Sequence, residues 1–124
     1  MKNTFKSEIS YCNTDLTVKE KIQFKNLNDS QSVNTLENGT KLTVDKWGVV
    51  QIHNEKLDEP DYQNVVLVTP DGNKYHTSSN SFFMAIDDIQ SELDDAGEKG
   101  AFDIRIVKKQ SKNNSGQFIT CVLA

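Results

Sequence analysis

Residues 101–124, AFDIRIVKKQSKNNSGQFITCVLA, indicate a mainly β fold because they hold two strand patterns joined by a polar loop. In the first pattern Phe102, Ile104 and Ile106 alternate with polar residues, which is typical of a strand with one buried face. The second pattern, 118–123, is a β-prone run of strand length. We therefore expect the chain to end in two strands that belong to the core.

The loop between these strands is basic, on a protein that is acidic overall. It offers no apolar side chain as an anchor, and its cations are Lys108, Lys109 and Lys112. The net charge of −4 divides into +1 over residues 1–56, −8 over 57–100 and +3 over 101–124. Acid on one side of a molecule leaves the field on the other side positive, which favours a polyanion partner. The alternative is a solvated helix face plus one acidic loop.

Residues 81–97, upstream of this stretch, change to a helical period. Apolar side chains recur there at spacings of three and four, at Phe82, Ala85, Ile86, Ile89 and Leu93. Asn80 or Ser81 is suited to cap the start of this helix, and Gly97 to end it. We expect one amphipathic helix whose apolar stripe packs on a sheet or on the end of a barrel.

The earlier part of the chain is rich in β patterns. We expect strands over 5–11, 17–27, 40–53, 62–69 and 73–77. In the second of these, alternation places a basic stripe on the outer face. Residues 26–37 are predicted to be a loop, and Gly48 to bend or bulge the long strand. Pro70-Asp71-Gly72 predicts a hairpin turn between the last two strands.

This order of elements predicts the fold class. Five or six strands, with one helix at about 81–97 before the last two, form the order of an OB-fold, a partly open Greek-key barrel. A different small barrel and an antiparallel sheet backed by one helix are the alternatives. The length of 124 residues predicts one OB-fold-like domain over 1–124.

Composition also bounds the cellular setting. The sequence has no run of 18 apolar residues and no apolar segment of a secretory signal at its start, so we expect a cytosolic protein without a membrane partner. Cys12 and Cys121 lie in or beside strand patterns without metal-ligand spacing. They are therefore predicted to be reduced core cysteines.

Catalysis has little support in the sequence. His53 and His76 fall in strand patterns without an obvious acidic or nucleophilic partner. The carboxylate pairs Asp87–Asp88 and Asp94–Asp95 occupy adjacent helix positions, which point about 100° apart and diverge. We therefore predict a protein that is not an enzyme, with no catalytic residue, no metal and no cofactor. A metal-dependent nuclease is possible only where carboxylates from different strands meet.

The residues suited to binding a single strand of nucleic acid are present. Sequence-tolerant binding uses aromatic faces for stacking on bases and cations that follow the phosphates. The candidate aromatics are Trp47, Tyr62 and Tyr75, each of which also fits a core position, Trp47 above all. The candidate cations are Lys19, Lys21, Lys25, Lys41, Lys46, Lys74, Lys108, Lys109 and Lys112.

Several short motifs, taken together, resemble the single-stranded DNA-binding proteins of phi29-like bacteriophages over nearly the whole chain. They are Leu36, Gly39 and Thr40; Asp71-Gly72-x-x-Tyr75; a Ser-led helix with Ala85 and Asp88; Phe102 and Val107; and the ending Ser111, Gly116, Phe118, Val122 and Leu123. The resemblance implies a monomer in the host cytoplasm that coats single-stranded DNA during phage replication, beside phage replication proteins. It also implies DNA-contacting tyrosines on barrel strands.

Not every tyrosine position of the phi29-like proteins has a tyrosine in this chain. Tyr75 matches one of the tyrosine positions, whereas two others fall near Val50 and Leu57, where this chain has no aromatic ring. Trp47 or Tyr62 is the possible substitute. The main rival hypothesis is a phage-encoded inhibitor that uses the acidic region 57–100 as a nucleic-acid mimic against a host enzyme.

Overall fold

The computed structural model describes residues 5–110 and 117–124, and within them the fold is mainly β, as the sequence predicts. In chain order the elements are β1 (Phe5–Cys12), α1 (Val18–Lys25), the 3-10 helix η1 (Leu27–Asp29), β2 (Gln31–Ser32), the 3-10 helix η2 (Val33–Thr35), β3 (Lys41–Val44), β4 (Lys46–Asn54), β5 (Asp61–Val68), β6 (Lys74–Thr77), α2 (Asn80–Asp95), β7 (Phe102–Gln110) and β8 (Gln117–Leu123). Among the described residues, none of the helices is long and apolar enough to cross a bilayer.

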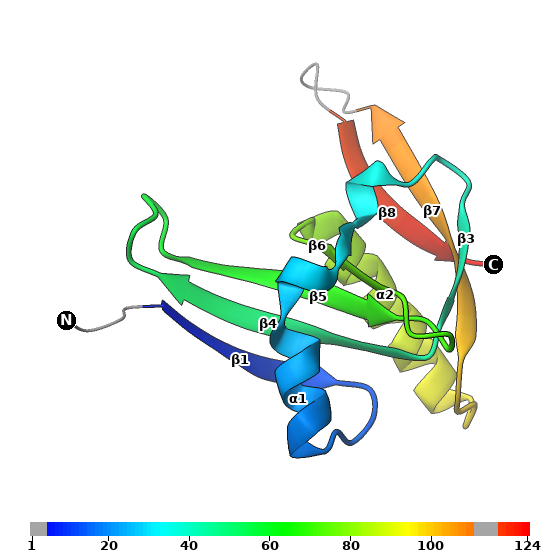
Figure 1. The fold of residues 1–124 in the computed structure, drawn as a ribbon. Coiled ribbons are helices and arrows are strands. Elements are labelled where there is room, and N and C mark those ends of the chain that lie inside the picture. The colour runs from blue at the N-terminus through cyan, green and yellow to red at the C-terminus, as the bar shows by residue number, and fades with distance from the viewer. Residues whose placement is uncertain (1–4, 111–116) are drawn as a thin grey trace.

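The strands form two sheets that do not close on one another, an arrangement that fits an OB-like fold. The five-stranded sheet has the order β1-β4-β5-β6-β2, antiparallel except for the β6–β2 pair, and the three-stranded antiparallel sheet has the order β3-β7-β8. The run 41–54 serves both sheets, because β3 pairs with β7 while β4 pairs with β5. Figure 1 shows the β4–β5 hairpin projecting away from the second sheet, with β1 beside it.

The run 17–27, predicted to be a strand, is instead mostly the helix α1. Thr17 and Glu20 form a capping box, in which each side chain accepts a hydrogen bond from the other residue's backbone N–H. The spacing of Val18 and Ile22 suits one face of a helix as well as one face of a strand. The described residues therefore contain two α-helices where one was predicted, and more strands than the predicted five or six.

The long strand predicted over 40–53 is broken at Asp45, between β3 and β4, rather than at Gly48. The irregularity near Gly48 lies in the partner strand, where the register of β1 shifts between Ile9 and Tyr11. Gly48 itself allows a close approach: a Cβ atom there would lie 2.3 Å from the Tyr11 carbonyl oxygen. The glycine thus allows the backbone of β1 to approach β4 closely within the sheet.

The second helix agrees closely with its sequence pattern. α2 runs from Asn80 to Asp95, and the side chain of Ser79 caps it by accepting a hydrogen bond from the Phe82 N–H. Gly97 has a φ of 74°, the left-handed conformation of a helix-ending glycine. The 70–72 turn joins β5 to β6 as predicted.

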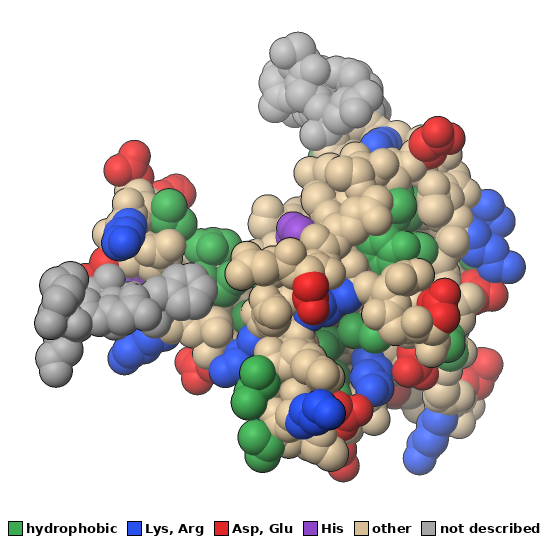
Figure 2. All heavy atoms as spheres, in the orientation of Figure 1, with side chains coloured by type: hydrophobic (Ala, Val, Ile, Leu, Met, Phe, Trp, Pro, Cys, Tyr) green, Lys and Arg blue, Asp and Glu red, His purple; other side chains and the backbone are tan. Residues whose placement is uncertain are grey.

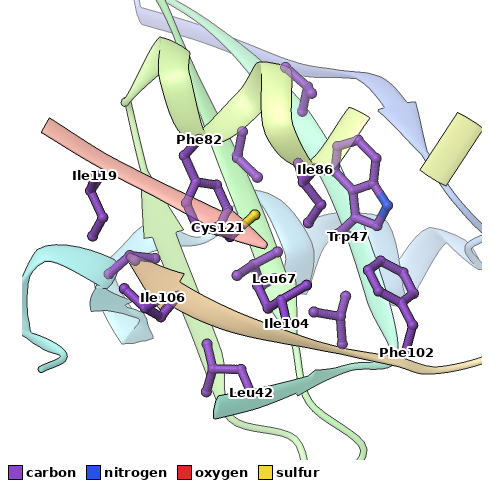
Figure 3. Close-up of a cluster of buried hydrophobic side chains, with 14 residues drawn as sticks. Leu42, Trp47, Leu67, Phe82, Ile86, Phe102, Ile104, Ile106, Ile119 and Cys121 are labelled. Carbon is purple, nitrogen blue, oxygen red and sulfur yellow. The ribbon is translucent and has the colours of Figure 1, made fainter. Parts of the chain in front are cut away.

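The main core lies between the two sheets and α2. Figure 3 shows Phe82 and Ile86 of α2 pointing toward Leu67, Ile104 and Cys121 from the strands. Cys121 is a buried free thiol, and desolvation raises its pKa to about 12. Cys12 is also a free thiol and is half-buried. Both cysteines are therefore unpaired, as the sequence predicts.

A second, smaller core lies on the opposite face of the five-stranded sheet. Phe24 of α1 packs there with Val50, Ile52 and Val66. Neighbouring strand residues point to opposite faces, which is why Val65 and Leu67 join the main core and Val66 joins this one. The outer face of β4, β5 and β6 is therefore partly covered by α1 (Figure 1).

Candidate nucleic-acid interface

The β4–β5 hairpin and β1 carry an exposed aromatic next to a cation. Tyr62 is paired with Ile52, and Ile52 with Ser7, so the three side chains lie in one row on one face of the sheet. Tyr62 is 37% exposed. At the other end of the row, the Lys25 ammonium donates a hydrogen bond to the Ser7 carbonyl oxygen at 3.3 Å. We call Ser7, Lys25 and Tyr62, which flank the buried Ile52, the arm surface.

Sequence reasoning singled out Tyr62 and Lys25 but did not connect them. They are 37 positions apart in the chain, and only the register of β1 against β4 and β5 brings them to one face. The side-chain period of a strand is two, so a slip of one residue in that register would move Tyr62 to the other face.

The helix α1 supplies further cations at the edge of the arm surface. Lys19 and Lys21 are exposed, and Lys21 and Lys25 line a groove between α1 and β1 together with the acids Glu8 and Asp15. Figure 2 shows the face that carries α1, where basic and acidic side chains alternate around hydrophobic ones. The groove therefore carries both positive and negative side chains, and its two lysines do not form a continuous basic patch.

Two of the predicted cations are engaged in holding α1 and η1 to the sheet. The Lys46 ammonium lies 2.9 Å from Oε2 of Glu20. Lys74, whose side chain is 10% exposed, lies 2.6 Å from Oδ1 of Asp29 and also donates to the Gln23 carbonyl. Both lysines therefore help to hold the fold together, and the phosphate contacts predicted for them stay predictions.

Trp47 and Tyr75 point into the main core. Trp47 is completely buried, and its Nε1 donates to Oε1 of Gln90 at 2.9 Å. Its ring is not accessible to a base, so Trp47 occupies a core position, which was the alternative to stacking that the sequence left open. Tyr75 is half-buried and packs against the main core from β6.

The basic residues of the last hairpin point in different directions. Lys108 donates from its ammonium to the Asn34 carbonyl at 2.9 Å, so it ties β7 to η2. Lys109, the next residue, is exposed on the other face of β7. Lys112 lies outside the described residues. Lys108 and Lys109 both belong to β7, so the predicted loop begins later than the sequence indicated.

The histidines differ from expectation in one respect. His53 does have acidic partners: its Nδ1 lies 2.6 Å from Asp61 and its Nε2 3.2 Å from Glu55, and these carboxylates raise its pKa. His76 shares a hydrogen bond of 2.6 Å with Ser30. The described part of the chain contains no group of three or more His, Cys, Asp or Glu side chains placed to hold a metal ion.

The acidic residues of α2 and the segment after it are all exposed, at Asp87, Asp88, Glu92, Asp94, Asp95 and Glu98. They lie on the helix that backs the main core, whereas α1 lies across the other face of the five-stranded sheet (Figure 1). The exposed acids of α2 and the lysines of α1 therefore lie on different layers of the molecule.

Comparison with known proteins gives one match. A family model described as "Phage Single-stranded DNA-binding protein" matches residues 1–124, the whole chain. No curated protein and no solved structure matches the chain.

Proposed function

This chain belongs to the family of phage single-stranded DNA-binding proteins, and we propose that it coats and protects single-stranded DNA with little sequence preference during phage DNA replication in the host cytoplasm. The family match over the whole chain is the observation that carries the proposal. The family is one of DNA-binding proteins, not of enzymes. We further propose that the protein acts as a monomer beside phage replication proteins.

The arm surface supports this proposal chemically. Tyr62 has an exposed ring for stacking on a base, and Lys25 has its ammonium on the same face. Stacking depends on the π-face that every base has, so an aromatic platform binds without regard to sequence. We assign phosphate neutralisation to Lys25 together with Lys19 and Lys21 of α1.

Tyr75 and Lys109 are proposed as additional contacts. The contact of Tyr75 is proposed from its match to a tyrosine position of phi29-like proteins and from a side chain that is only half-buried. Lys109 is exposed near the end of β7. Lys112 is a proposed contact from sequence alone.

The direct test is a binding titration of the whole protein with labelled poly-dT, with and without excess unlabelled duplex. We expect duplex to compete poorly, because its base faces are stacked inside the helix. We also expect the logarithm of affinity to fall linearly with the logarithm of salt concentration, by about 0.7 per phosphate neutralised. Absence of binding to poly-dT at low salt overturns the proposal.

A second candidate function is favoured by the exposed acids of α2. A surface rich in carboxylates on one helix resembles the charge of a nucleic-acid backbone, and such a protein would act as an inhibitor of a host nucleic-acid enzyme. The same titration separates the two functions, since a mimic does not bind poly-dT.

A further inference from the structure

The outer face of the three-stranded sheet carries an exposed aromatic residue that neither core uses. Phe118 of β8 is 39% exposed, while its neighbours Ile119 and Cys121 are buried in the main core. Phe118 is paired with Lys109 of β7, so both side chains stand on the outer face. Directly opposed residues have Cβ atoms about 5 Å apart, so the lysine stem lies within reach of the ring.

Two further cations lie on the same face. Arg105 of β7 is paired on one side with Lys41 of β3 and on the other with Val122 of β8, which is 48% exposed. Like charges directly opposed across strands destabilise a sheet. The Lys41–Arg105 pair is therefore a cost to the fold that an anion bound between them would offset.

The neighbouring groups leave this face positive. The one acidic residue of β7 is Asp103, which accepts a hydrogen bond from the Thr43 hydroxyl at 2.6 Å and lies 3.4 Å from the Lys41 ammonium. Arg105 donates one hydrogen bond, to the Gly39 carbonyl at 3.0 Å, and a guanidinium has five donors. Three cations thus face one acid, and Figure 2 shows basic side chains at the right-hand edge of the molecule, beside β3 and β7.

We propose that this face, defined by Lys41, Arg105, Lys109 and Phe118, is a second contact surface for single-stranded DNA, in which Phe118 stacks on a base. The proposal rests on the proposed function and adds to it a site on the other sheet from the arm surface. An aromatic ring among cations is the combination that sequence-tolerant strand binding uses. Lys109, directly opposite Phe118, and Arg105, four residues away along β7, neutralise successive phosphates of the bound strand.

The first experiment compares Phe118→Ala with Met84→Ala in poly-dT titrations. Met84 is 61% exposed on the acidic helix α2, so it is a matched loss of exposed apolar surface away from the proposed site. We expect Phe118→Ala to bind roughly 5- to 150-fold more weakly, the range for one stacked base, and Met84→Ala to bind as wild type does. Equal affinity of wild type and a folded Phe118→Ala overturns the inference, while wild type that fails to bind overturns the proposed function.

A second variant keeps the inference testable if Phe118→Ala does not fold. In Phe118→Trp the new indole keeps an aromatic face, and its emission is separable from that of buried Trp47 by difference from wild type. We expect near wild-type affinity and quenching of the added emission at saturating poly-dT. Unquenched added emission at saturation overturns the stacking.

The cations are tested through the salt dependence. Arg105→Gln with Lys109→Gln should reduce the slope of log affinity against log salt by about 1.4, at about 0.7 per lost phosphate contact. Lys56→Gln, in the β4–β5 turn, removes one exposed positive charge away from this face and is the control that should leave the slope unchanged. A wild-type slope in the double variant contradicts phosphate contact at this face.

Discussion

At the level of single residues, Gly48 allows β1 and the Phe24 ring of α1 to approach β4 closely. A Cβ atom at this position would lie 2.3 Å from the Tyr11 carbonyl oxygen and 3.0 Å from Cζ of the Phe24 ring. We therefore expect Gly48→Ala to lower the free energy of unfolding by about 1–3 kcal/mol, the usual cost of overpacking. Urea denaturation of both proteins measures the change, and equal midpoints would contradict the close packing of Phe24 on the strand.

Tyr62 is the residue on which the arm surface depends most. Its ring is more than a third exposed and belongs to neither core cluster, so truncation should affect binding more than folding. We expect Tyr62→Ala to weaken poly-dT binding by about 1–3 kcal/mol, and Tyr62→Phe to bind as wild type does.

Thermal denaturation is the control for this comparison. A melting temperature of Tyr62→Ala close to that of wild type assigns the loss of affinity to the interface. If the folded alanine variant keeps full affinity, Tyr62 does not stack on DNA and the proposed arm surface is wrong.

At the level of elements, α1 and α2 show which signals in the sequence are reliable. α2 has sixteen residues and five apolar positions at helical spacing, so its period is unambiguous. α1 has only eight residues, and the alternation around Phe24 also suits a strand. The Thr17–Glu20 capping box was the available signal for a helix. The strand patterns of β7 and β8 were predictable because alternation places their buried residues on one face, and β5 was predictable as a β-prone run of strand length that is buried on both faces.

The capping box makes the stability of α1 depend on pH. The Thr17 backbone N–H donates to Glu20, and Lys46 pairs with it, so the Glu20 pKa falls to about 2. A carboxyl whose folded pKa is depressed stabilises the fold above its unfolded pKa, near 4.3, and loses that contribution as pH falls toward the folded value.

We therefore expect Glu20→Gln to be less stable than wild type at pH 6–7 and the difference to shrink between about pH 4.5 and pH 2. Urea midpoints across this range measure it. Glu37→Gln, a change of the same kind in the loop before β3, is the control and should show no comparable convergence. A constant difference between Glu20→Gln and wild type would show that Glu20 acts through packing rather than charge.

At the level of the whole molecule, the sequence predicted where acidic residues are concentrated better than it predicted which residues form the binding site. The acids of α2 are exposed, as the acidic region 57–100 suggested, and exposed lysines lie on α1 in another layer. Which cations are available was not predictable, because Lys46, Lys74 and Lys108 are engaged by Glu20, Asp29 and Asn34, residues distant in sequence. Such pairs depend on how α1 and η2 lie against the sheets, which local patterns do not encode.

The acidic helix is expected to influence DNA binding through its field rather than by contact. Neutralising Asp87→Asn, Asp88→Asn and Glu92→Gln together changes the net charge from −4 to −1 and removes repulsion of the phosphates. We expect severalfold tighter poly-dT binding at low salt, with the gain fading at high salt because the Debye length shrinks from about 30 Å at 0.01 M to about 3 Å at 1 M. The triple variant contacts the same number of phosphates as wild type. At high salt, where the acidic helix is screened, the two proteins should therefore have the same slope of log affinity against log salt. Fluorescence anisotropy across a salt series measures both quantities, with Ser91→Ala, exposed on the same helix, as the uncharged control. Weaker binding of the triple variant would instead show that these carboxylates take part in recognition, as the nucleic-acid mimic requires.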